Sequence, residues 1–148
     1  MSPSTSAHTI YSVPGDGTAA LKWESTNAYT EDSSGKPIYD WKIVDRIIDT
    51  YIQAHAKPFV EIGFMPEALS VKPRPIRATG PSPTTGKAGP VRQWVLHSVE
   101  RYGKPEVETW YWEVWNEPDI SYWKGTPEEY NKPYDYAVAG VKKTLPTA

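Results

Sequence analysis

The residues best suited to chemistry stand at the end of the most aromatic run of this sequence. The stretch WYWEVWNEPD, residues 110–119, leads into Asn116, Glu117 and Pro118. A carboxylic acid at the rim of a buried strand is partly withdrawn from water, which suits it to act as a general acid at neutral pH. Hydrolysis of a glycosidic bond needs such an acid, and a second carboxylate about 5–5.5 Å away if configuration is retained. Asn116 could then hydrogen-bond a sugar hydroxyl.

Glu117 has a second interpretation, in which it precedes a turn, stays solvated and has no role. The aromatic run favours the site. Placing a carboxylate beside a buried strand costs desolvation free energy, which a residue without a function would not offset. Glu113, inside the run, is expected to pair with an Arg or Lys of a neighbouring strand. Tyr122 and Trp123 either pack in the core or form a wall on which a sugar stacks, and the sequence favours neither interpretation.

Other chemistry finds little support. The three histidines, His8, His55 and His97, lack metal-ligand spacing, and His97 is expected to lie at the surface or to pack between helices. The chain has no cysteine, no G-x-S-x-G motif and no phosphate-binding glycine loop. We therefore expect neither a metal site nor a cofactor.

Composition excludes several classes of partner. The 148 residues carry a net charge of −2, without a basic footprint for nucleic acid, and no apolar segment approaches the length of a membrane span. The N-terminus lacks the basic start and apolar stretch of a secretory signal, so a cytoplasmic location is expected. Seven tryptophans and ten tyrosines against two phenylalanines suit either a core or a wet groove that stacks on flat ligands.

The first half of the chain predicts one strand and one helix after an irregular lead-in at 1–19. Residues 20–25 alternate as a short strand would, and 30–37 have turn chemistry. A helix is predicted at 41–55, with Asp40 as its N-cap. Its apolar residues recur at helical spacing: Trp41, Val44, Ile48, Tyr51 and Ile52.

The second half alternates in the same way. A buried strand is predicted at 57–66, followed by a long Pro- and Gly-rich loop at 66–90. An amphipathic helix at 91–103 stops at Gly103, and the aromatic run 110–115 is the next strand.

The last predicted helix runs from 127 to about 144. Thr126 and Glu129 form a capping box around Pro127, and Pro133 should bend the helix or delay its start.

This order of strands and helices predicts an α/β fold with a parallel sheet covered by helices. Ligand sites of such sheets gather beyond the carboxyl ends of the strands. Glu67 follows one strong strand and Glu117 follows the next, so both are expected on the same rim. Glu67 could equally cap the start of a helix.

Three separated blocks, 21–51, 57–69 and 107–130, resemble glycoside hydrolase family 39 and, within it, the bacterial β-xylosidases. The resemblance implies a (β/α)8 barrel that acts on β-xylosides or xylo-oligosaccharides from the non-reducing end with retention. It implies that Glu117 is the general acid/base and that Asn116 contacts the sugar's 2-hydroxyl.

A complete barrel takes about 250 residues, so residues 20–148 are expected to form a partial (β/α)8 TIM barrel of about three βα units. The resemblance places the family's catalytic nucleophile beyond Ala148. Asp119 stands where the family usually has Asn. Either Glu67 or Glu24 could substitute for the nucleophile, and association of copies through open sheet edges is expected.

Three alternatives remain at this point. One is a non-catalytic remnant of the barrel that binds carbohydrate through Asn116 and Trp123, and another is a non-functional gene fragment. Within the family, α-L-iduronidase activity is the alternative at the level of substrate.

Overall fold

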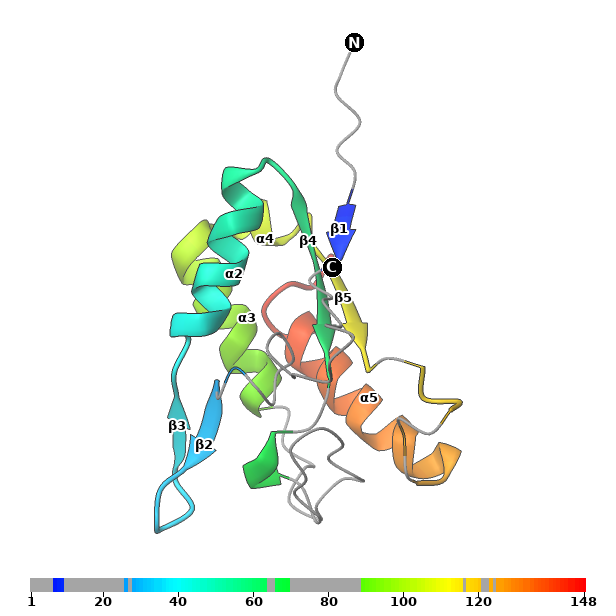
Figure 1. Cartoon of the computed structure of the whole chain (residues 1–148). Coiled ribbons are helices and arrows are strands. Elements are labelled where there is room, and N and C mark those ends of the chain that lie inside the picture. The colour runs from blue at the N-terminus through cyan, green and yellow to red at the C-terminus, as the bar shows by residue number, and fades with distance from the viewer. Residues whose placement is uncertain are drawn as a thin grey trace.

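The computed structural model describes residues 7–9, 26, 28–63, 66–69, 89–115, 117–120, 123 and 125–148. Strands β1 (Ala7–Thr9), β4 (Lys57–Ile62) and β5 (Tyr111–Val114) form a parallel sheet in the order β1-β4-β5. Helices α2 (Lys42–Gln53), α3 (Gly89–Tyr102) and α5 (Pro127–Lys142) lie along one side of it (Figure 1). The predicted α/β alternation with a parallel sheet is confirmed.

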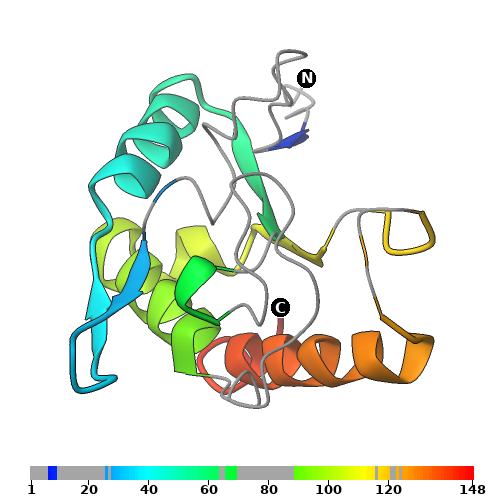
Figure 2. The ribbon, with the colours of Figure 1, turned by 60° about the horizontal axis from the view of Figure 1, so that its bottom comes forward.

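The core fills the space between the sheet and these helices, which curve around the strands in a second view (Figure 2). Pro58 and Val60 alternate as buried residues along β4, so one face of this strand reaches the core. The largest fully buried apolar side chains come from five different segments: Ile48, Val60, Val95, Val107 and Leu145.

A two-stranded antiparallel sheet precedes α2. It consists of β2 (Tyr29–Glu31) and β3 (Pro37–Tyr39), joined by a turn at 32–36. Asp32 Oδ1 accepts the backbone N–H groups of Ser34 at 2.8 Å and Lys36 at 2.9 Å, which closes the turn. The turn predicted at 30–37 is confirmed, although the short strands on either side of it were not predicted.

The N-terminal segment differs from its prediction. Ala7–Thr9, inside the lead-in expected to be irregular at 1–19, form β1 and pair with β4 from Lys57. Three residues are too few to show a periodic pattern, so this strand left no signal in the sequence. The strand expected at 20–25, and 70–88 of the expected loop 66–90, lie outside the described residues.

Helix α2 is two residues shorter at its C-terminal end than predicted, and its N-cap differs by one residue. The N-cap is Trp41, and Asp40 lies immediately before it. Asp40 Oδ1 still accepts the backbone N–H of Lys42 at 3.0 Å, so the predicted side chain satisfies a free N–H group from one position earlier. Val44 and Ile48 of the predicted stripe are buried.

Helix α3 ends where the sequence predicted. Gly103 follows its last residue with a φ of 86°, a left-handed conformation that glycine adopts without steric cost. A further short helix, α4 (Lys104–Val107), begins directly afterwards and was not predicted. β5 then starts at Tyr111, one residue later than predicted.

Helix α5 begins with the predicted capping box. The Glu129 N–H donates to Thr126 Oγ1 at 3.2 Å, and the Thr126 N–H donates to Glu129 Oε2 at 2.8 Å. Pro133 lies inside the helix, which starts at Pro127, so the prediction of a delayed start is wrong. The capping box satisfies free N–H groups of the first turn, which favours an early start.

A polar network joins α2 to α3. Arg101 Nη2 lies 2.7 Å from Asp49 Oδ2, and the Tyr102 hydroxyl donates to Asp49 Oδ1 at 2.9 Å. His97 Nε2 lies 2.7 Å from Asp45 Oδ1. His97 therefore packs between helices, which confirms one of its two predicted roles.

We predict that Thr126→Ala lowers the free energy of unfolding by about 1 kcal/mol, because it removes an N-cap acceptor. Urea unfolding followed by circular dichroism measures this loss. The matched control is Thr50→Ala on the exposed face of the last turn of α2, where the hydroxyl donates to Arg46 O. The control should be neutral or slightly stabilising, and an equal loss in both variants would contradict the role of the cap.

We also predict a pH-dependent effect of Asp49→Asn. The hydrogen bond from Arg101 holds the pKa of the Asp49 carboxyl below its ordinary value. A carboxyl with a lowered folded-state pKa stabilises the fold above its unfolded-state pKa, and this contribution disappears as the pH falls through the folded-state pKa. The variant should therefore be less stable at neutral pH, and the difference should shrink below about pH 4.

Urea unfolding of both proteins at neutral pH and near pH 2.5 provides the comparison. Asp135→Asn, on the exposed surface of α5, is the matched control and should change little at either pH. An Asp49→Asn effect as large in acid as at neutral pH would contradict the ion-pair explanation.

Candidate active site

The candidate site lies where β4 and β5 end at the same edge of the parallel sheet (Figure 1). Ile62 is opposite Val114, and the Trp115 N–H donates to Ile62 O at 3.0 Å, one residue beyond β5. A Cβ atom on Gly63 would lie only 3.2 Å from Trp115 Cα. Glycine at this position lets the two strand ends approach closely, which fixes them side by side.

The backbone turns sharply after β5. Trp115 has a φ of 67° and Glu117 a φ of 46°, both in the left-handed region. This conformation costs a non-glycine residue about 1–3 kcal/mol and persists where the surrounding structure enforces it, often at functional sites. The turn carries Glu117 out of the sheet to an exposed position. Asn116, between the two, lies outside the described residues.

Three aromatic residues hold this turn. The Trp115 and Trp123 rings meet edge to face at 5.2 Å and 90°, and the Trp123 and Tyr130 rings do so at 5.5 Å and 79°. The Tyr130 hydroxyl donates to Val114 O, the last carbonyl of β5, at 2.9 Å. Burial is the main cause that raises the pKa of Tyr130, so its hydroxyl remains a protonated donor at neutral pH.

Trp123 lies in the core beneath the turn. Only 6% of it is exposed, and its indole N–H donates to Thr126 O at 3.2 Å. Of the two interpretations left open by the sequence, these contacts favour packing, and a sugar-stacking role for Trp123 stays a prediction. Tyr122 lies outside the described residues.

The sequence predicted Glu117 and Glu67 on this rim and offered Glu24 as a further carboxylate. The sequence predicted a Glu117 partly withdrawn from water, whereas the structure has it exposed. Glu67 begins the 3-10 helix η1 (Glu67–Leu69), whose Leu69 N–H donates to Pro66 O at 2.9 Å. Its backbone thus starts a short helix, as one of its two interpretations supposed, while its side chain lies outside the described part of the chain. Glu24 lies outside it as well.

The prediction for Glu113 is wrong. Its partner in register on the neighbouring strand is Glu61, another carboxylate and not an Arg or Lys. Two positions earlier in the register, the Phe59 and Tyr111 rings stack with centroids 5.7 Å apart. Residues two apart on a strand share a face, so an aromatic pair and an acidic pair follow one another toward the rim.

Sequence reasoning missed this face because it treated each strand separately. A signal was present, since an aromatic residue precedes a glutamate by two positions in both KPFVEI and YWEV. Aligning the two strands in parallel register would have brought both pairs together.

Metal and membrane chemistry find no support within the described ranges. There, no group of three or more His, Asp or Glu side chains could hold a metal ion. No helix in those ranges is long and apolar enough to cross a membrane.

Comparison with known proteins points to one family. The family model for glycosyl hydrolases family 39 matches residues 18–148. A β-xylosidase of Geobacillus stearothermophilus is 37% identical over 122 residues, covering 78% of this chain and 24% of that protein. A β-xylosidase of Caldicellulosiruptor saccharolyticus is 39% identical over 107 residues, covering 68% of this chain and 22% of that protein. The chain thus spans about a quarter of the length of these relatives.

A solved structure extends the match to the fold. A monomeric β-xylosidase of Caulobacter crescentus superposes with a TM-score of 0.70 at 32% identity, covering 81% of this chain and 25% of that one. Structural neighbours of this family give the chain a TIM-barrel-like α/β fold, in agreement with its parallel sheet and helices.

We predict that Glu113→Gln raises the free energy of unfolding by about 0.2–1 kcal/mol, because like charges directly opposite each other destabilise a sheet. Thermal and urea unfolding at neutral pH and low salt measure the gain. Glu100→Gln, on the exposed surface of α3, makes the same change in net charge and is the control. A variant no more stable than this control would show that the Glu61–Glu113 pair carries no repulsion.

Proposed function

Because the chain belongs to glycosyl hydrolases family 39, we propose that it is the acid/base-bearing part of a retaining β-xylosidase. Its substrate is a β-xyloside or a xylose-containing oligosaccharide, cleaved from the non-reducing end. The proposal rests on one observation above all. The left-handed turn through Trp115 and Glu117 presents a carboxylate at the carboxyl edge of the parallel sheet, where active sites of such barrels lie.

In the first step Glu117, as the acid, gives its proton to the leaving oxygen while a second carboxylate attacks the anomeric carbon. The glycosidic C–O bond breaks and a covalent xylosyl intermediate forms. In the second step the Glu117 carboxylate takes a proton from water, whose oxygen replaces the nucleophile. Asn116 hydrogen-bonds the sugar's 2-hydroxyl, while Trp123 packs beneath the turn that carries Glu117 and supports it from the core.

The second carboxylate is the missing part. The chain spans about a quarter of its β-xylosidase relatives, and we infer that it forms about three βα units of a (β/α)8 barrel. The nucleophile then comes from residues that are not among these 148. Alone, the chain should hydrolyse xylosides poorly, since nothing supports the oxocarbenium-like transition state from the opposite side of the sugar.

A chimera tests the role of Glu117. We expect the Caulobacter crescentus β-xylosidase to stay active when this chain replaces its matched quarter. In that chimera Glu117→Gln should lower kcat/KM, which reports the first step, about 10²–10⁴-fold for an alkyl xyloside, whose leaving group needs protonation. The loss should be far smaller for a dinitrophenyl xyloside, whose leaving group departs as an anion.

Asp119→Asn in the same chimera is the control, because Asp119 is a neighbouring exposed carboxylate that the mechanism does not use. Equal losses for both leaving groups in Glu117→Gln would contradict the acid role.

Calorimetry of the isolated chain with xylobiose addresses the second candidate, a carbohydrate-binding remnant. Binding by the isolated chain together with an inactive chimera would favour the remnant.

A further inference from the structure

One peptide unit at the end of β5 is held from two opposite sides. The C=O group of Val114 and the N–H group of Trp115 belong to the same planar trans unit, so they point in opposite directions. On one side, the Trp115 N–H donates to Ile62 O of β4 at 3.0 Å. On the other side, the Tyr130 hydroxyl of α5 donates to Val114 O at 2.9 Å. A strand and a helix together therefore fix the plane of this unit.

The fixed plane matters because the chain leaves the sheet at the next rotatable bond. Rotation about the N–Cα bond of Trp115 gives it a φ of 67°, and Glu117 follows two residues later with a φ of 46°. A tilt of the held unit would thus be carried into the position of the Glu117 carboxylate. Left-handed backbone persists only where its surroundings enforce it, and the Tyr130 hydroxyl supplies one of these constraints.

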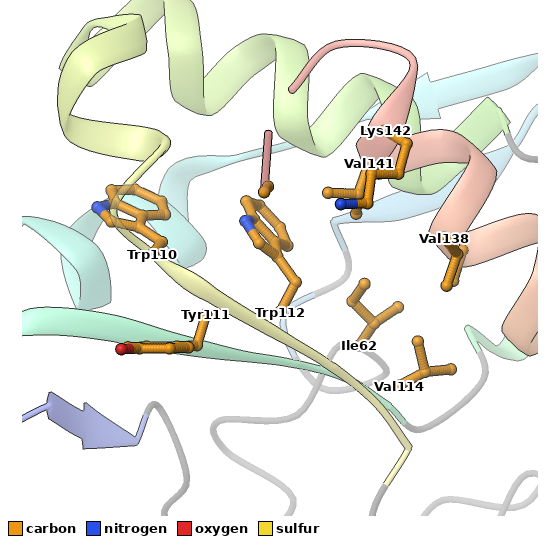
Figure 3. A pocket seen from close by; sticks show the side chains of 10 residues that line it. Ile62, Trp110, Tyr111, Trp112, Val114, Val138, Val141 and Lys142 are labelled. Carbon is orange, nitrogen blue, oxygen red and sulfur yellow. The ribbon is translucent and has the colours of Figure 1, made fainter. Parts of the chain in front are cut away.

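The position of Tyr130 is itself fixed by the start of α5. Its N–H donates to Thr126 O at 3.0 Å, within the first turn that the capping box closes. The same helix covers this end of the strand. Figure 3 shows Ile62 and Val114, which are partners in register, on the side of the sheet where Val138 of α5 lies. The hydroxyl therefore reaches Val114 from a capped helix and not from a loop.

The chain beyond Glu117 returns to the same tyrosine. The Ile120 N–H donates to Glu117 O at 3.3 Å, and the Trp123 N–H donates to Ile120 O at 3.3 Å. The Trp123 ring then meets the Tyr130 ring edge to face at 5.5 Å. Glu117 thus lies between two points that Tyr130 contacts, Val114 O before it and the Trp123 ring after it.

Packing alone does not require the hydroxyl of Tyr130. A phenylalanine ring could fill the same space between the Trp123 and Tyr134 rings. A hydroxyl on a partly buried side chain costs desolvation free energy, which its hydrogen bond must offset. The bond to Val114 O is therefore the feature of Tyr130 that core packing leaves unexplained.

We propose that Tyr130 is a positioning residue for the acid step. Its hydroxyl holds the peptide unit after Val114, and this unit sets where Glu117 meets the leaving oxygen. The inference rests on the proposed function, because it concerns Glu117 as the acid/base. The second carboxylate of the mechanism comes from elsewhere, so Tyr130 should affect proton donation and leave the attack on the anomeric carbon unchanged.

Kinetics of the chimera with the Caulobacter crescentus β-xylosidase test the proposal. Tyr130→Phe keeps the ring and removes the bond to Val114 O. We expect kcat/KM to fall about 10–100-fold for an alkyl xyloside, because a misplacement of about 1 Å has a cost of this order. The value for a dinitrophenyl xyloside should change far less. Tyr136→Phe removes an exposed hydroxyl from the same helix and is the matched control, which should leave both values unchanged.

The ratio of the two kcat/KM values is the decisive quantity. It does not depend on how much of the variant is folded, so a loss of stability alone cannot change it. An unchanged ratio in Tyr130→Phe beside a lowered ratio in Glu117→Gln overturns the positioning role and keeps Glu117 as the acid. Equal losses for both substrates in Glu117→Gln reject the proposed function, and the positioning role with it.

Hydrogen exchange of the full chain, measured by NMR, tests the held peptide unit without catalysis. In Tyr130→Phe the Trp115 amide should exchange about 2–10-fold faster than in the unaltered chain, because its peptide unit has lost one of two hydrogen bonds. The amides of α2 are the internal control and should change little. Unchanged exchange at Trp115 in the folded variant overturns the proposal, whatever the kinetics show.

Discussion

The parallel pairing of β4 with β5 is the interaction on which the rest of the structure depends. Its last hydrogen bond, from the Trp115 N–H to Ile62 O, brings the carboxyl ends of both strands to one edge. Gly63 allows the backbone at Trp115 to come close at this point. The turn that carries Glu117 begins directly after this bond, because the chain leaves the sheet here.

Packing offsets the strain that this exit creates. Two left-handed non-glycine residues are unfavourable in isolation. Trp115 is buried against Trp123, Trp123 against Tyr130, and the Tyr130 hydroxyl binds the last carbonyl of β5. Core packing and a rim carboxylate are thus coupled through the same turn. The enforced left-handed backbone fixes the direction in which the chain leaves the sheet at Glu117, and the Glu117 side chain is exposed there.

Local rules predicted the local features of this fold. The capping box of Thr126 and Glu129 and the stop at Gly103 depend on neighbouring residues alone, so the sequence contains the full signal. The position of Glu117 after an apolar strand was predictable for the same reason. The Glu61–Glu113 pair depends on which residues of two separate strands lie opposite each other, and no single segment contains that information.

The central claim is that Glu117 is the acid/base of a retaining glycosidase, and azide rescue tests it most directly. In the chimera with the Caulobacter crescentus β-xylosidase, Glu117→Ala removes the base that activates water in the second step. Azide needs no base and can attack the xylosyl intermediate itself. With a dinitrophenyl xyloside, the account predicts that azide restores turnover and yields β-xylosyl azide with retained configuration. Turnover that azide leaves unchanged, with xylose as the only product, would contradict it.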